Sequence, residues 1–213
     1  MKLTIRFILL FCLLFSGTAA RAGAYDDVIR AISMGDHNTV TSLLQKGLDV
    51  DSVDREGDTL LMMAAKEGNV NVIRALLSRK PKVGAQNSLG ESALMFASIK
   101  GHLEVVKLLL AEGAQIDQAG WTPLMYAASM NRIDVMKLLV VRGAKIDAPN
   151  STGVTALMLA AREGQTQAVL LLMEYGANVN QVAPGSGYTA LKASRQRNHD
   201  EITRILLKAG AKE

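Results

Sequence analysis

The residues that carry most enzyme chemistry are not arranged in a catalytic pattern in this chain. The histidines, His37, His102 and His199, are far apart in sequence, and Cys12 is the only cysteine. The sequence contains no H-x-x-x-H pair, no cysteine pair and no G-x-S-x-G segment, which metal-dependent, thiol and serine enzymes use. We therefore expect no enzyme activity, no catalytic residue, no cofactor and no metal site.

Neither the glycine-rich segment nor the carboxylates of the sequence indicate a catalytic site. The glycine-rich residues 184–187 neither follow a predicted strand nor carry the lysine of a phosphate-binding loop. The carboxylates stand mainly in predicted turns, without the paired apolar surroundings that would raise a pKa. A binding function therefore fits the sequence better than catalysis, which leaves an enzyme or a metal-binding protein as a remote alternative.

One short phrase returns along the chain and points to the elements that position its side chains. The intervals between the glycines that open the phrase are 33, 30, 33 and 34 residues. The five copies are GDTLLMMAA from Gly57, GESALMFAS from Gly90, GWTPLMYAA from Gly120, GVTALMLAA from Gly153 and GYTALKAS from Gly187. Each copy precedes a second apolar stretch with helical spacing, and four of these stretches end in a Gly-Ala turn.

The phrase, its period and the Gly-Ala turn resemble those of the ankyrin-repeat family from about residue 25 to the C-terminus. The resemblance implies an all-α solenoid of helix-turn-helix units with short hairpin fingers. We expect a cleaved leader at 1–24 and a single ankyrin-repeat domain at 25–213. The expected repeats, about six in number, are 25–54 as the N-terminal cap, 55–87, 88–118, 119–150, 151–182 and 183–213 as the C-terminal cap.

Local residue choices support these helices. A Thr or Ser precedes each first helix and can accept from an otherwise unpaired backbone N–H: Thr59, Ser92, Thr122, Thr155 and Thr189. Pro123 stands at a first helical position, where its missing N–H does no harm. Each second helix is predicted to end before a glycine that takes a left-handed conformation, as at Gly113 and Gly143.

A methionine replaces the histidine that the family carries after T-P-L. The positions are Met62, Met95, Met125 and Met158, with Lys192 in the last repeat. We interpret the methionines as buried core residues that fill gaps flexibly. A metal-binding or redox-active methionine array is the alternative.

The first residues have the form of a secretory signal peptide. Lys2 and Arg6 precede an apolar run of nine residues, 7–15, and small residues follow. The run is too short for a stable membrane span, so no membrane anchor is expected after cleavage, which we place within residues 20–24. The protein is therefore expected to be periplasmic or secreted, and the expected compartment is a bacterial periplasm.

Loss of this leader changes the charge balance. The remainder carries 21 basic and 20 acidic residues, so the basic pI gives little support to nucleic-acid binding. Charge is nevertheless uneven, with Asp49, Asp51, Asp54, Glu56 and Asp58 early and Lys192, Arg195, Arg197, Arg204, Lys208 and Lys212 late. Two interpretations stay open: solvated caps, or a dipolar surface that steers a partner.

The finger at residues 115–120 is about three residues shorter than the others and places Trp121, the only tryptophan, at its base. The shorter finger leaves a notch in the row of fingers. Trp121 either anchors a partner or packs over this notch. The resemblance implies a partner-binding face made of finger residues, one residue after each phrase glycine, and helix ends. These residues are Arg55, Glu56, Leu89 and Thr152; Asp58, Glu91, Trp121, Val154 and Tyr188; and Lys66, Glu67, Met130, Arg162, Glu163 and Arg195.

The sequence thus predicts an exported, non-catalytic module, expected to be a monomer, that binds a protein partner on its concave helix and finger face. Two narrower roles remain: an immunity-type inhibitor that caps a toxic enzyme, and a scaffold for a resident envelope protein. Neither nucleic acid nor membrane is an expected partner.

Overall fold

The computed structural model describes residues 23–212. These residues form two compact units, which divide between residues 82 and 83 and are described separately below. The predicted signal peptide lies outside the described residues, apart from residues 23 and 24.

The first unit consists of helices stacked in pairs. Residues 23–34 are helical and are followed by α2 (His37–Gln45), α3 (Leu60–Glu67) and α4 (Val70–Leu77). Helix α4 packs against both α2 and α3. Val28, Val40 and Val72 are fully buried, so the apolar stripe of each helix faces the interior of the stack.

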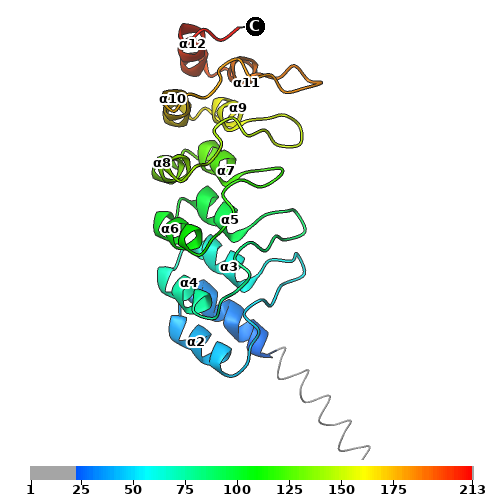
Figure 1. Ribbon diagram of the computed structural model, residues 1–213, viewed down its shortest axis with the longest axis vertical. Helices are drawn as coiled ribbons and strands as arrows, with labels where there is room; N and C mark the ends of the chain where they lie inside the picture. Colours follow the sequence, from blue (N-terminus) through cyan, green and yellow to red (C-terminus); the bar gives the residue numbers. More distant parts are fainter. Residues whose placement is uncertain (1–22, 213) are drawn as a thin grey trace, which may run out of the picture. The chain divides into compact units, whose positions relative to one another are not determined.

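The second unit contains four helix pairs. Its helices are α5 (Ala93–Lys100), α6 (Leu103–Ala111), α7 (Pro123–Ser129), α8 (Ile133–Val141), α9 (Ala156–Arg162), α10 (Thr166–Glu174), α11 (Ala190–Gln196) and α12 (Asp200–Lys208). Within this unit, α5, α7, α9 and α11 form an inner row, while the even-numbered helices form an outer row on the side away from the fingers (Figure 1). The predicted all-α solenoid is confirmed.

The fingers are minimal hairpins. Isolated antiparallel bridges join Val53 to Thr59 and Ala183 to Tyr188. Residues 23–212 contain no strand that is longer than such a bridge. In the finger after α8, the Asn150 N–H donates to the Val154 carbonyl at 2.9 Å. Each long finger therefore closes on itself and holds the residue that follows its glycine at the base of the hairpin.

The predicted N-caps are confirmed at four of five positions. The hydroxyls of Thr59, Thr122, Thr155 and Thr189 accept from the backbone N–H three residues later. The prediction for Ser92 is wrong in its contact, because Ser92 occupies the cap position of α5 without making a cap hydrogen bond. Its hydroxyl instead accepts from the Gln118 amide at 2.8 Å.

The methionine column is buried, as predicted. Met62 is 1% exposed in the first unit, and Met95, Met125 and Met158 are at most 2% exposed in the second. Lys192, at the same position of the last repeat, is exposed, and its ammonium donates to the Gly187 carbonyl at 2.7 Å. The last repeat thus presents a charged side chain where the preceding repeats present core methionine, as a capping repeat requires.

Side chains tie each repeat of the second unit to the next. Asp117 accepts from the Lys145 N–H at 3.2 Å, and Asp147 accepts from the Asn178 N–H at 3.0 Å. His199 bonds through a ring nitrogen to the Arg162 carbonyl at 3.0 Å. These contacts fix the spacing of the fingers and inner helices that carry the candidate site.

Candidate protein-binding surface

The predicted binding residues of the first unit gather around one finger, but one of them is not available to a partner. Arg55 and Glu56 are exposed at the finger tip, and Glu67 is exposed at the end of α3. Asp58 is only 4% exposed, so the expectation that it faces solvent is wrong. Its carboxylate forms an ion pair with the Lys66 ammonium. This pairing offsets the free-energy cost of burying the carboxylate charge.

In the second unit, the predicted residues differ in exposure. Leu89 is 80% exposed and Met130 47% exposed, and both are large apolar side chains open to solvent. The remaining predicted residues with exposed side chains are Thr152, Glu163 and Arg195, and those with half-buried side chains are Glu91, Val154, Arg162 and Tyr188. The structure therefore leaves most of the predicted surface of this unit accessible.

Trp121 is both packed and accessible. Its ring lies against that of Tyr126 with centroids 5.1 Å apart and planes inclined by 36°. The tryptophan nevertheless keeps 36% of its surface exposed. The two sequence interpretations, an anchor and a packed residue, are thus compatible: one part of the side chain is fixed by Tyr126, and another remains open to a partner.

Tyr126 is a site residue that the sequence reasoning missed. It lies in α7, three residues after Pro123, and the equivalent position of the preceding repeat is Phe96. Aromatic side chains at the same position of successive repeats were the available signal.

A chain of hydrogen bonds links Tyr126 to the neighbouring finger. The Tyr126 hydroxyl donates to Glu91 Oε1 at 2.8 Å, and Asn87 Nδ2 donates to Glu91 Oε2 at 3.1 Å. The Asn87 side-chain oxygen in turn accepts from the N–H groups of Leu89 and Glu91 at 3.0 and 2.9 Å. The finger that carries Leu89 and the helix that supports Trp121 are therefore held by one network.

The Tyr126 hydroxyl is held in its neutral form. Burial raises its pKa above the ordinary value, and the hydrogen bond to Glu91 and the charge of that carboxylate raise it further. The phenol therefore remains protonated and continues to donate well above neutral pH.

The shortened finger is braced by side chains because it lacks the hairpin hydrogen bond. Gln118 donates to Ser92 of its own repeat and accepts from the Gln86 amide of the preceding repeat. Asp117 accepts from the Lys145 N–H of the following repeat. The notch beside Trp121 is thus a defined structure held from both sides.

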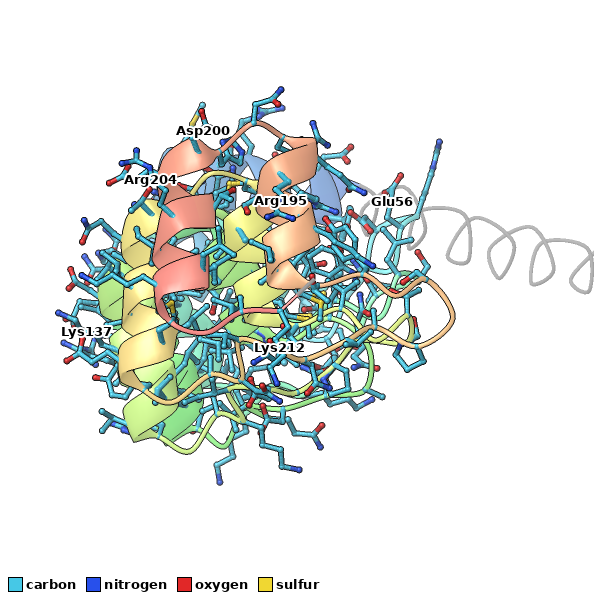
Figure 2. The ribbon with its side chains drawn as sticks, turned by 90° about the horizontal axis from the view of Figure 1, so that it is seen from above. Glu56, Lys137, Arg195, Asp200, Arg204 and Lys212 are labelled. Carbon is cyan, nitrogen blue, oxygen red and sulfur yellow. The ribbon has the colours of Figure 1, made fainter. Side chains whose placement is uncertain are left out.

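The residues that follow the phrase glycines in this unit, Glu91, Trp121, Val154 and Tyr188, are here called the finger-base column, and positive charges lie near its Tyr188 end. Tyr188 is half-buried, and burial raises its pKa, while the positive charges of Arg162 and Arg197 act in the opposite direction and Glu163 acts with burial. These charges therefore lie close enough to Tyr188 to act on its hydroxyl. Arg195 lies on α11 of the same repeat (Figure 2).

The described residues offer neither a metal-binding cluster nor a membrane-spanning helix. Residues 23–212 contain no group of three or more His, Cys, Asp or Glu side chains that could hold a metal ion. Over the same residues, no helix has both the length and the apolar character that crossing a bilayer requires.

The repeated helix pairs, finger hairpins and buried phrase residues define an ankyrin stack. A family model described as "Ankyrin repeats (3 copies)" matches residues 28–118, 79–150 and 143–213. The chain therefore belongs to the ankyrin-repeat family, whose fold indicates a protein–protein interaction module and is generally a non-catalytic scaffold.

Two solved structures illustrate the similarity. The human ASB11 ankyrin repeat domain shares 24% identity, with 87% of this chain and 84% of that chain covered and a TM-score of 0.79, which shows the fold. The second is a chain of the complex between the predatory endopeptidase Bd0816 from Bdellovibrio bacteriovorus and the immunity protein Bd3460. It shares 30% identity, with 85% of this chain and 97% of that chain covered and a TM-score of 0.75. Comparison with curated proteins found no match.

Proposed function

We propose that this chain is an exported protein-binding module that acts in the periplasm and holds its partner on the inner-helix and finger face of residues 83–213. The observation that carries the proposal is Trp121, which keeps about a third of its surface exposed while its ring is fixed against Tyr126. Export rests on the form of residues 1–24, with their basic start, short apolar run and small residues.

Pre-organisation is the physical reason that this arrangement suits binding. A partner that covers a fixed aromatic ring does not have to order it, so less conformational entropy is lost on association. The Tyr126–Glu91–Asn87 network extends this order to the finger that carries Leu89, which is 80% exposed. Rigid aromatic anchors beside exposed apolar side chains are typical of the residues that dominate interface energies.

A second, narrower function is favoured by one comparison. The similar chain in the complex of an endopeptidase with an immunity protein is covered over 97% of its length at 30% identity. We therefore propose, as the alternative, that this chain acts as an immunity-type inhibitor of a peptidase in the same compartment. A scaffold role for an envelope protein would use the same face without blocking an active site.

Affinity capture tests the binding function. The full chain with a C-terminal tag is expressed in the source cell, so that any leader is processed naturally, and captured proteins are identified by mass spectrometry. In the test variant Trp121→Ala/Tyr188→Ala, each truncation should weaken binding by more than about 1 kcal/mol. The control variant Val141→Ala/Leu170→Ala removes exposed apolar side chains from the outer helices α8 and α10.

One dominant partner that is retained by the control and lost by the test variant supports the proposal. Unchanged affinity in the test variant refutes the assignment of the surface. The mass of the captured chain also shows whether cleavage falls within residues 20–24, and an uncleaved chain refutes export by this leader. Loss of the partner's peptidase activity on adding the chain would favour the inhibitor over the scaffold.

A further inference from the structure

The last repeat of the second unit is positively charged on its inner side. Residues 175–199 include Lys192, Arg195 and Arg197 and contain no Asp or Glu. All three basic residues are exposed and stand within α11 or at its end. The segment therefore contributes three basic side chains and no acidic one.

The preceding repeat adds to this charge. Arg162, at the end of α9, pairs through Nε with Glu163 at 2.7 Å, but both side chains are more than one-third exposed, so the pair is screened by water. Arg162 and Arg197 both act electrostatically on Tyr188. His199, two residues after Arg197, bonds to the Arg162 carbonyl at 3.0 Å, so the ends of α9 and α11 that carry the two guanidinium groups are neighbours.

The outer helices of the same unit do not share this pattern. Lys107 pairs with Glu104 in α6, and Asp200 and Glu201 occupy the first turn of α12, which also carries Arg204. Figure 2 shows Lys137 and Arg204 on outer helices, whereas Arg195 lies on the inner helix α11. The excess of positive charge is therefore a property of the inner face rather than of the whole unit.

The aromatic and basic features follow one another in a fixed order. In this unit α5 packs on α7, α7 on α9 and α9 on α11, so equivalent positions of successive repeats are neighbours. The finger-base column of this unit, Glu91, Trp121, Val154 and Tyr188, therefore begins with a carboxylate that is bonded to Tyr126 and continues from Trp121 through an aliphatic position to Tyr188. A segment that lies along this column meets apolar surface first and positive charge second.

We propose that the finger-base column of residues 83–213 binds a segment of the partner protein that is apolar where it meets Trp121 and carries carboxylate side chains where it meets Tyr188, Arg162 and Arg197. This inference rests on the proposed protein-binding function and specifies the chemistry of the partner. Guanidinium groups bind carboxylates through paired N–H donors, and opposite charges also speed encounter between the proteins. The order of the two halves fixes the direction in which the segment binds.

Synthetic peptides test this chemistry, with the full chain's single tryptophan as the reporter. The first peptide joins a Leu-Phe pair to a run of Glu, the second replaces each Glu by Lys, and the third replaces the Leu-Phe pair by Gly-Ser. The first peptide should change the fluorescence of Trp121 and bind at least about tenfold more tightly than either of the others. Its affinity should fall as salt is raised from about 50 to 500 mM.

Charge variants locate the effect on the surface. Arg162→Glu/Arg197→Glu should weaken binding of the first peptide by about tenfold or more, since each reversal removes an attraction and adds a repulsion. The matched control Lys137→Glu/Arg204→Glu changes the net charge equally on the outer helices and should leave the affinity unchanged. If the reversed variant fails to fold, Arg162→Gln/Arg197→Gln provides the same comparison with a smaller effect.

The outcomes separate this inference from the function on which it rests. Equal binding of the Glu and Lys peptides would overturn the acidic partner while leaving protein binding intact. Equal binding of the Gly-Ser peptide would reduce the site to an anion site and would also overturn the inference. No binding of the first peptide, or equal losses in the test and control variants, would overturn it too, whereas protein binding itself is judged by the capture experiment.

Discussion

Replacing Tyr126 by Phe tests the network that holds the aromatic site. The change removes the hydroxyl that donates to Glu91 at 2.8 Å and leaves the ring that packs against Trp121. A hydrogen bond to a charged acceptor contributes about 1.5–3 kcal/mol when buried, but Glu91 is half-buried and keeps its bond from Asn87. We therefore expect the free energy of unfolding to fall by about 1 kcal/mol at pH about 8.

The same variant should lose its disadvantage at high pH. The pKa of Tyr126 is raised in the folded chain above its ordinary value of 10.0, so above that pH the unfolded phenol releases its proton while the folded phenol keeps it. The folded state then binds more protons than the unfolded state, and stability falls as pH rises. One pH unit above the ordinary pKa removes about 1.4 kcal/mol, so wild type and Tyr126→Phe should be about equally stable near pH 11.

Denaturant unfolding followed by Trp121 fluorescence measures both effects, and Tyr175→Phe is the control. Tyr175 is exposed at the end of α10, so its variant should stay within about 0.5 kcal/mol of wild type. A difference between wild type and Tyr126→Phe that stays constant from pH about 8 to 11 would refute the protonation argument. A difference below about 0.3 kcal/mol at the lower pH would show that the Glu91 hydrogen bond contributes no stability.

Three further predictions concern the framework, and each is checked by the midpoint of denaturant unfolding. Thr122→Ala should cost about 1 kcal/mol through loss of its N-cap bond, and Ser92→Ala, which loses no cap bond, should cost less; the opposite order would contradict the assigned contacts. Met125→Ala should cost about 2–5 kcal/mol because the side chain is 0% exposed and its removal leaves a cavity, and a smaller loss would mean that the core collapses to fill it. Gly164→Ala should cost more than about 1 kcal/mol, because φ is +74° and the new Cβ would lie 2.7 Å from the His199 ring; a neutral result would show that the ring moves away freely.

Much of the framework could be predicted because it depends on short-range rules. A Thr before an apolar stretch satisfies backbone N–H groups within one turn, so the caps at Thr122 and Thr155 followed from the sequence. Burial of Met125 and Met158 followed from their fixed place in the repeat. Repetition strengthened each inference, because the same local choice was available for comparison several times.

The details of the site could not be predicted, because they depend on which side chains meet across the fingers and helices. The turning of the Ser92 hydroxyl towards Gln118 is set by a finger 26 residues away. The donation from Tyr126 to Glu91 joins residues 35 apart. Burial of Asp58 depends on the Lys66 ammonium, which reaches it from the far end of α3. Side-chain pairings of this kind are not fixed by the repeat pattern and require coordinates.

The bonds from one loop to the next also bear on how such a chain can change in length. Asp117 accepts from Lys145, Asp147 from Asn178 and Asn180 from Lys212, so each acceptor is matched by a donor in the repeat that follows. Duplication of a whole repeat inside this unit would supply one new donor and one new acceptor and leave no group unmatched. An insertion of part of a repeat would separate a carboxylate from its donor, so this direction-dependent linkage favours evolution of the stack by whole-repeat steps.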